Sequence, residues 1–161
     1  MGLHIVLVEP EIPQNTGNIA RTCAATGATL HLIEPLGFSL EDRYLKRAGL
    51  DYWDMLTMRR YPSLDLFMEE HGEKPLFLVT TKAQQVYADV RYPPDCYLLF
   101  GRETAGLPED VLKARPGRCI RIPMVEDARS LNLSNSVAIV AYEYYRQQGF
   151  AGMRRLGCFP E

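Results

Sequence analysis

Short apolar runs alternate with amphipathic segments along the whole of this 161-residue chain. The run at residues 3–8 is apolar and β-branched and predicts a buried strand, and further runs predict strands at residues 29–33, 76–80, 97–100 and 119–122. The segments between them predict helices at residues 15–26, 39–49, 63–70, 108–114 and 134–148. Strands that alternate with helices favour an α/β fold, with a mostly parallel sheet covered by helices on both faces.

Polar residues mark where several of these helices are expected to begin. Asn15 and Ser134 each precede a helical pattern, and a side-chain oxygen at such a position caps the first turn. Residues 39–42 resemble a capping box with Asp in place of the usual Glu. We therefore expect these three positions to be helix N-termini.

Composition places the chain among ordinary globular proteins. It is 47% hydrophobic and 24% charged, and its length suits one domain, which we predict to span residues 1–152, with residues 153–161 as a loosely held tail. The formal net charge of −2 excludes a general polyanion-binding protein, which needs a basic face. Isolated basic pairs, such as Arg59-Arg60, are typical of a solvated surface.

Several common functional motifs are missing from the sequence. The four cysteines include no C-x-x-C pair and there are only three histidines, so we predict no metal site. There is no G-x-G-x-x-G, no G-x-S-x-G and no complete phosphate-binding loop. No signal peptide or long apolar span is present, which predicts a cytoplasmic protein that does not enter a membrane.

Three polar segments remain, and each follows a predicted strand, which is where open α/β sheets bind ligands. In the first, Asn15 and Arg21 suit a phosphate or a ribose hydroxyl, although a helix cap and a surface arginine are equally compatible with the spacing. In the second, Gly101 permits a tight turn or a close approach to a ligand. Glu103 then projects from that loop, either as a solvated acid or as a partner of Arg21.

The third segment lies between residues 122 and 136 and is dense in uncharged polar groups. It holds Asn132, Ser134 and Asn135 within four positions, more than one helix cap needs. Neutral donors and acceptors of this kind suit a nucleoside.

These segments resemble the three ordered motifs of the ribose 2′-O-methyltransferases of the SPOUT superfamily. The motifs are N-x-x-N-I-A-R at residues 15–21, F-G-x-E-x-x-G-L-P at residues 100–108, and I-P-M followed by S-L-N-L-S-N-S-V-A at residues 122–138. The resemblance runs from about residue 3 to residue 152. The opening E-P-E-I-P-x-N-T-G-N and the segment R-A-G-L-D-Y-W at residues 47–53 look most like small transfer-RNA methyltransferases of this superfamily.

The resemblance implies a fold, a cofactor and an assembly. It implies a C-terminal trefoil knot, S-adenosylmethionine as the methyl donor with no metal, and a homodimer built on the helices that hold Arg21 and Tyr142. By correspondence of motif positions, the residues implied to bind the cofactor are Val79, Gly101, Ile122, Ser130 and Leu131, and those implied to act on the substrate are Asn15, Arg21, Glu103, Ser134 and Asn135.

The implied reaction is methyl transfer to the ribose 2′-hydroxyl of the wobble nucleotide, cytidine or a modified uridine, in the anticodon stem-loop of leucine tRNAs. We interpret Arg21 as a ligand of phosphate and ribose, fixed by Glu103, because a guanidinium scarcely loses its proton in a protein. Two alternatives stay open: a ribosomal-RNA 2′-O-methyltransferase of the same superfamily, and a non-catalytic nucleoside- or RNA-binding protein.

Overall fold

A single six-stranded sheet organises the chain in the order β3-β2-β1-β5-β4-β6, and every neighbouring pair is parallel. The computed structural model describes residues 2–161, with residues 48–51 described by their backbone alone. The strands are β1 (Leu3–Val8), β2 (Thr29–Ile33), β3 (Met58–Tyr61), β4 (Leu76–Val79), β5 (Cys96–Phe100) and β6 (Cys119–Ile120). The helices are α1 (Pro13–Thr26), α2 (Arg43–Gly49), α3 (Leu64–His71), α4 (Glu109–Ala114) and α5 (Leu133–Gln147), with short 3-10 turns at Leu50–Met55 and Pro116–Arg118.

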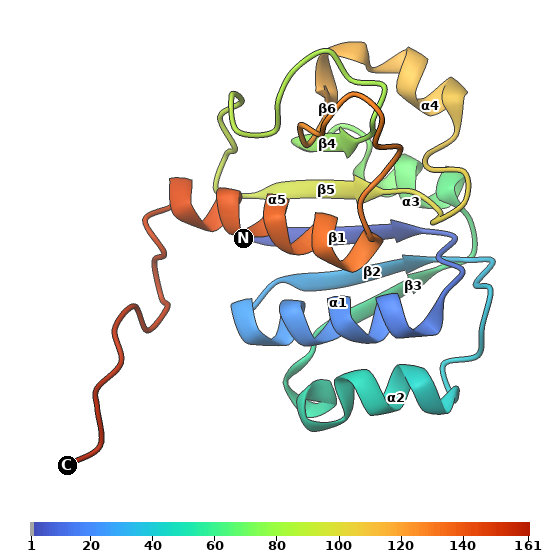
Figure 1. Ribbon diagram of the computed structural model, residues 1–161. Helices are drawn as coiled ribbons and strands as arrows, with labels where there is room; N and C mark the ends of the chain where they lie inside the picture. The colour runs from blue at the N-terminus through green and yellow to red at the C-terminus, as the bar shows by residue number, and fades with distance from the viewer. Residues whose placement is uncertain (1) are drawn as a thin grey trace.

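The central strand β1 is buried on both faces, which explains why its sequence is apolar except for His4. Leu3, Ile5 and Leu7 point to the face covered by α1 and α5, while Val6 and Val8 point to the face covered by α3 and α4. Figure 1 shows α1 and α5 side by side over the sheet. The predicted α/β architecture with helices on both faces is confirmed.

The edge strand β3 was not predicted, and the helix expected to begin at residues 39–42 begins later. The strand β3 reads Met-Arg-Arg-Tyr, and its two arginines are exposed because it is an edge strand paired only with β2. It therefore lacks the apolar run that marks a buried strand. The capping box at residues 39–42 is also wrong: Asp42 caps α2 by accepting from the backbone N–H groups of Tyr44 and Leu45.

The C-terminal half of α5 is tied to the long connection between β4 and β5. The Gln147 side chain accepts from the Tyr92 N–H at 2.9 Å and donates to the Val90 carbonyl at 2.9 Å. Gln148 donates to the Tyr92 carbonyl, and the Tyr144 hydroxyl donates to the Pro94 carbonyl. These bonds satisfy the polar backbone of a connection that has no ladder of its own.

Beyond α5, Phe150 and Met153 still pack against the core, whereas residues 154–161 are exposed and extend away from the sheet without regular structure (Figure 1). The domain boundary at residue 152 and the trefoil knot stay predictions. Within residues 2–161, no helix is both long and apolar enough to cross a membrane.

Packing of α3 on the sheet generates a stability prediction. Phe67 is fully buried, whereas the preceding Leu66 is 47% exposed on the same helix. We expect Phe67→Ala to lower the free energy of unfolding by about 3–5 kcal/mol, because it leaves a cavity. Leu66→Ala, the matched control, should cost well under about 1 kcal/mol. Urea denaturation measures both, and equal losses would contradict this description of α3.

Candidate active site

A cavity of about 600 Å³ opens at the carboxyl ends of β4 and β5, beside the segment that follows β6. All three polar segments singled out in the sequence reach it, as expected for the ligand-binding edge of an α/β sheet. It is lined by seven of the ten predicted site residues: Asn15, Val79, Gly101, Glu103, Ile122, Ser130 and Leu131. The other three, Arg21, Ser134 and Asn135, lie outside its lining.

The carboxylates of Glu11 and Glu103 join two loops beside the cavity, because each carboxylate binds the loop that carries the other. The Glu103 carboxylate accepts hydrogen bonds from the backbone N–H groups of Glu11, at 2.9 Å, and Ile12, at 2.7 Å, and from the Asn15 side chain, at 3.3 Å. In return, the Glu11 carboxylate accepts from the Thr104 backbone N–H at 3.1 Å and from its hydroxyl at 2.7 Å. The bonds from Thr104 hold the pKa of Glu11 below its usual value. The segments after β1 and β5 therefore hold each other in place through charge-assisted bonds.

Asn132 connects the third segment to the first. Its side-chain oxygen caps α5 by accepting from the backbone N–H groups of Ser134 and Asn135, and it also accepts from the Ser134 hydroxyl at 2.5 Å. Its side-chain nitrogen donates to the Asn15 side chain at 3.0 Å. The prediction that Ser134 caps this helix is therefore wrong. The cap is Asn132, a residue type that caps equally well and stands two positions earlier in the sequence.

Asn15 is not a helix cap either. Helix α1 begins at Pro13, and Ile12 at the cap position makes no side-chain cap. A proline in the first turn was a usable sequence signal for this earlier start. Asn15 is instead buried, and its amide joins Glu103 to Asn132 across the cavity wall. Its position between those two residues supports the functional interpretation of the first motif.

Arg21 does not contact Glu103 in the single chain that the structure describes, so the predicted pairing is corrected. Its guanidinium lies 4.9 Å from the centre of the Tyr52 ring, and the Tyr52 hydroxyl is 3.4 Å away. The reason is helical geometry, since six residues carry Arg21 about 9 Å along α1 from Asn15 and about 240° around it. Arg21 is therefore exposed on the outer side of α1.

Position 101 requires glycine because the backbone of residues 106 and 107 packs directly against it. A Cβ atom there would lie 2.0 Å from the carbonyl carbon of Gly106 and 2.1 Å from the backbone nitrogen of Leu107. The loop closes by two backbone hydrogen bonds between Arg102 and Gly106, and Gly106 itself has a φ of 68°. Of the two interpretations offered for Gly101, the tight turn is confirmed.

The lining combines apolar walls with hydroxyl and amide groups, and with four charged residues: Lys82, Arg102, Glu103 and Arg129. Val79, Leu107 and Ile122 supply apolar surface, and Thr80 and Ser130 add hydroxyl groups. The volume falls within the range of small-molecule sites. No cluster of His, Cys, Asp or Glu that would hold a metal ion occurs among the described residues.

Such a fold and cavity define the class of the protein: an α/β protein with a cavity of small-molecule size at the carboxyl edge of a parallel sheet. A family model described as "SpoU rRNA Methylase family" matches residues 2–142. The chain belongs to this family and is a methyltransferase with the SPOUT fold.

Its relatives include proteins of similar length. The Escherichia coli K12 protein named tRNA (cytidine(34)-2′-O)-methyltransferase is 51% identical over 151 residues, which are 93% of this chain and 96% of that protein. A solved structure described as giving insight into 2-OH methylation of C/U34 on tRNA has a TM-score of 0.87 and 47% identity, covering 92% of this chain and 97% of that one. The SpoU methyltransferase AviRb from Streptomyces viridochromogenes, in complex with AdoMet, has a TM-score of 0.78 and 27% identity, covering 93% of this chain and 62% of that one.

The segment at residues 47–53, which contributed to the resemblance, includes residues 48–51, whose side chains lie outside the described part of the structure. The three ordered motifs are described in full. The family predicted from them is confirmed.

The reciprocal carboxylates generate a second prediction. Glu103→Gln replaces an acceptor-only oxygen by an NH₂ group that faces backbone donors, so we expect a loss of about 1–3 kcal/mol in the free energy of unfolding. Thermal unfolding followed by circular dichroism measures it. Glu109→Gln is the matched control, an exposed glutamate whose contacts are with Lys82 and Lys113, and should leave the midpoint nearly unchanged. An unchanged midpoint for Glu103→Gln would refute the arrangement.

Proposed function

We propose that this protein transfers a methyl group from S-adenosylmethionine to the ribose 2′-oxygen of nucleotide 34 in leucine tRNAs, where the nucleotide is cytidine or a modified uridine. One observation carries the proposal: the three motif segments meet at one cavity, in a chain about half identical, over nearly its whole length, to a protein named for 2′-O-methylation of cytidine 34. The choice of leucine tRNAs rests on the resemblance of the motifs.

The cavity suits S-adenosylmethionine. Apolar side chains of Val79, Ile122 and Leu131 offer walls for a purine and a methylene chain, and the loop around Gly101 and Ser130 offers backbone groups and a hydroxyl. A related structure holds AdoMet. When bound, this molecule supplies an activated methyl group on a sulfonium.

The protein's own side chains would position the target ribose for methyl transfer. Asn15, Asn132 and Ser134 form one hydrogen-bonded group beside the cavity and would orient the target ribose. Alignment of two reactants in this way accounts for a large share of many enzymatic rate enhancements. All the contacts that Glu103 makes are acceptor contacts to neighbouring donors, so its role is to hold the site together.

A homodimer is part of the proposal. Helices α1 and α5 lie side by side on one face of the sheet (Figure 1), and on α5 the side chains of Ile139 and Tyr142 are 36% and 47% exposed. Arg21 lies exposed on the outer side of α1, away from the lining of its own cavity. We infer that two copies meet through α1 and α5, so that Arg21 binds phosphate or ribose of an RNA held between the two molecules. The cytoplasm, where tRNA is available, is the proposed location.

A transfer assay tests the function. We expect purified protein, given S-adenosylmethionine with a labelled methyl group, to label leucine tRNA at the 2′-oxygen of nucleotide 34, located by nuclease mapping. A transcript with guanosine at position 34 is the substrate control and should stay unlabelled. Label on ribosomal RNA instead would favour the alternative that the family description suggests, and cofactor binding in calorimetry without turnover on any RNA would favour the non-catalytic alternative.

Arg21 is tested in the same assay under single-turnover conditions. We expect Arg21→Ala to slow transfer by about 100-fold, because a reactant loses its alignment, and Arg21→Lys to recover part of the rate by keeping the charge. Arg154→Ala, in the exposed C-terminal segment, is the control and should match the wild type. Near-normal rates for both Arg21 variants would eliminate its role.

The dimer is tested by analytical ultracentrifugation. We expect Tyr142→Glu to raise the dissociation constant of the dimer at least about 30-fold, since a buried aromatic anchor contributes about 2 kcal/mol or more. Leu66→Glu on α3 is the matched control, because Leu66 is also 47% exposed but lies on the opposite face of the sheet. An unaltered dimer with Tyr142→Glu would show that the interface lies elsewhere.

A further inference from the structure

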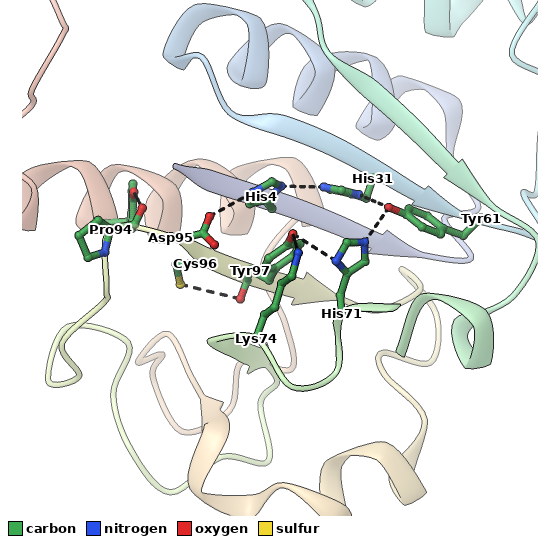
Figure 2. Close-up of polar contacts among 10 residues, drawn as sticks. His4, His31, Tyr61, His71, Lys74, Pro94, Asp95, Cys96 and Tyr97 are labelled. Atoms are coloured by element: carbon green, nitrogen blue, oxygen red, sulfur yellow. Dashed lines mark hydrogen bonds and ion pairs between the residues drawn. The ribbon is translucent and has the colours of Figure 1, made fainter. Parts of the chain in front are cut away.

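All three histidines of the chain lie in one polar chain on the face of the sheet that α3 covers, apart from the lining of the cavity (Figure 2). In the sequence they served only to predict the absence of a metal site. The polar chain connects seven side chains that come from β1, β2, β3, β5, α3 and the loops beside them, in the order Lys74, Tyr97, His71, Tyr61, His31, His4 and Asp95.

The interior contacts of this polar chain are short. His4 Nδ1 lies 2.9 Å from His31 Nε2, and His31 Nδ1 lies 3.0 Å from the Tyr61 hydroxyl. The Tyr61 hydroxyl lies 3.1 Å from His71 Nε2, and His71 Nδ1 lies 3.3 Å from the Tyr97 hydroxyl. His31 and His71 are almost fully buried, at 1% and 4% exposed. Each of these groups therefore depends on its neighbours for hydrogen bonds.

The polar chain ends in an ammonium group at Lys74 and in a carboxylate at Asp95. Lys74 Nζ lies 3.5 Å from the Tyr97 hydroxyl, and His4 Nε2 lies 3.5 Å from an Asp95 carboxylate oxygen. An ammonium group only donates hydrogen bonds, and an ionised carboxylate only accepts them.

Because one end can only donate and the other can only accept, all hydrogen bonds in the polar chain are donated in the same direction. Each of the five groups between them, three neutral imidazoles and two hydroxyls, donates one bond and accepts one. Donation therefore runs from Lys74 to Asp95, and every histidine carries its hydrogen on Nε2. In this arrangement all six links are made and no buried donor or acceptor in the polar chain is left over.

A further proton has no place in this arrangement. An imidazolium donates from both nitrogens, so a seventh hydrogen would have to share six links. Reversal of neighbouring bonds carries the conflict to the Lys74 end, where the exposed ammonium group must leave the Tyr97 hydroxyl. The added proton therefore leaves either a buried donor that faces another donor, which is costly in a protein interior, or a broken link at that end.

Burial and nearby charges also disfavour protonation of the three imidazoles. Four charged side chains face the polar chain: Arg59 of β3 and Lys74 repel a proton, while Glu70 of α3 and Asp95 attract one. Burial outweighs the attraction and lowers the pKa of all three imidazoles, that of His31 to about 3. Because an unfolded histidine titrates near 6.5, the unfolded chain binds more protons below that pH, and stability falls as the pH falls.

We propose that the polar chain is a pH-sensitive latch, which holds α3 against the sheet while its three histidines are neutral and releases α3 when the polar chain takes up a proton. Helix α3 is the element free to respond. It ends at His71, and Phe67, one turn earlier, packs against Tyr61 and His71 with ring centres 5.1 and 4.9 Å apart. Tyr61 ends the edge strand β3, which has only one neighbouring strand.

Amide hydrogen exchange on the full chain tests the latch. Exchange rates corrected for the intrinsic effect of pH give the local protection of each helix. Between about pH 7.5 and about pH 5.5 we expect protection of α3 to fall by up to about tenfold per pH unit for each proton taken up, while α1 and α5 keep theirs. Constant protection of α3, or an equal loss in all helices, would overturn the proposal.

Two further measurements separate the latch from a merely structural role. His71→Gln keeps a donor and an acceptor but does not titrate, so it should weaken the pH dependence of α3 protection. Glu69→Gln is the matched control, because Glu69 is exposed on the same helix and is not one of the charges that act on the three imidazoles, so it should preserve that dependence. Nitrogen NMR of the wild-type imidazoles at about pH 7.5 needs no variant and should show all three in the neutral Nε2–H form. A ring in the Nδ1–H form would refute the single direction of donation.

Discussion

The reciprocal carboxylate bonds between the segment after β1 and the loop after β5 hold the active-site edge together. Glu103 fixes the backbone at Glu11 and Ile12, and Glu11 fixes Thr104 in return. Parallel strands end at one edge without a hairpin to join them, so their following loops need such cross-links. Asn15 and Asn132 extend the same group of bonds to the start of α5.

The two faces of the sheet support different tasks. The face under α1 and α5 is apolar and positions the helix whose first turn carries Asn15. The opposite face contains the histidine–tyrosine chain among aromatic residues that include Phe67. Because side chains alternate along a strand, β1 serves both faces with residues one position apart, such as Leu3 and His4. The site and the latch are thus built on one strand without sharing a side chain.

Much of the fold was accessible from the sequence because buried parallel strands leave an unmistakable pattern. Strands β1 and β2 have the predicted bounds, since both are apolar runs ended by turn residues. The edge strand β3 was missed because half of it is exposed arginine. The three cap predictions, at Asn15, at Ser134 and at residues 39–42, failed because several residues in each segment can cap a helix, and only the path of the backbone selects among them.

Local pattern and motif order in the amino-acid sequence were enough to establish the α/β class, the family and seven residues of the cavity lining, because these depend on short stretches of chain. Folding in three dimensions determined which of the polar residues touch. It separated Arg21 from Glu103 by the turn of one helix, joined Asn15 to Asn132 over 117 positions, and gathered three scattered histidines into one hydrogen-bonded series. Contacts between residues so distant in sequence are set by strand order and register, which no local pattern encodes.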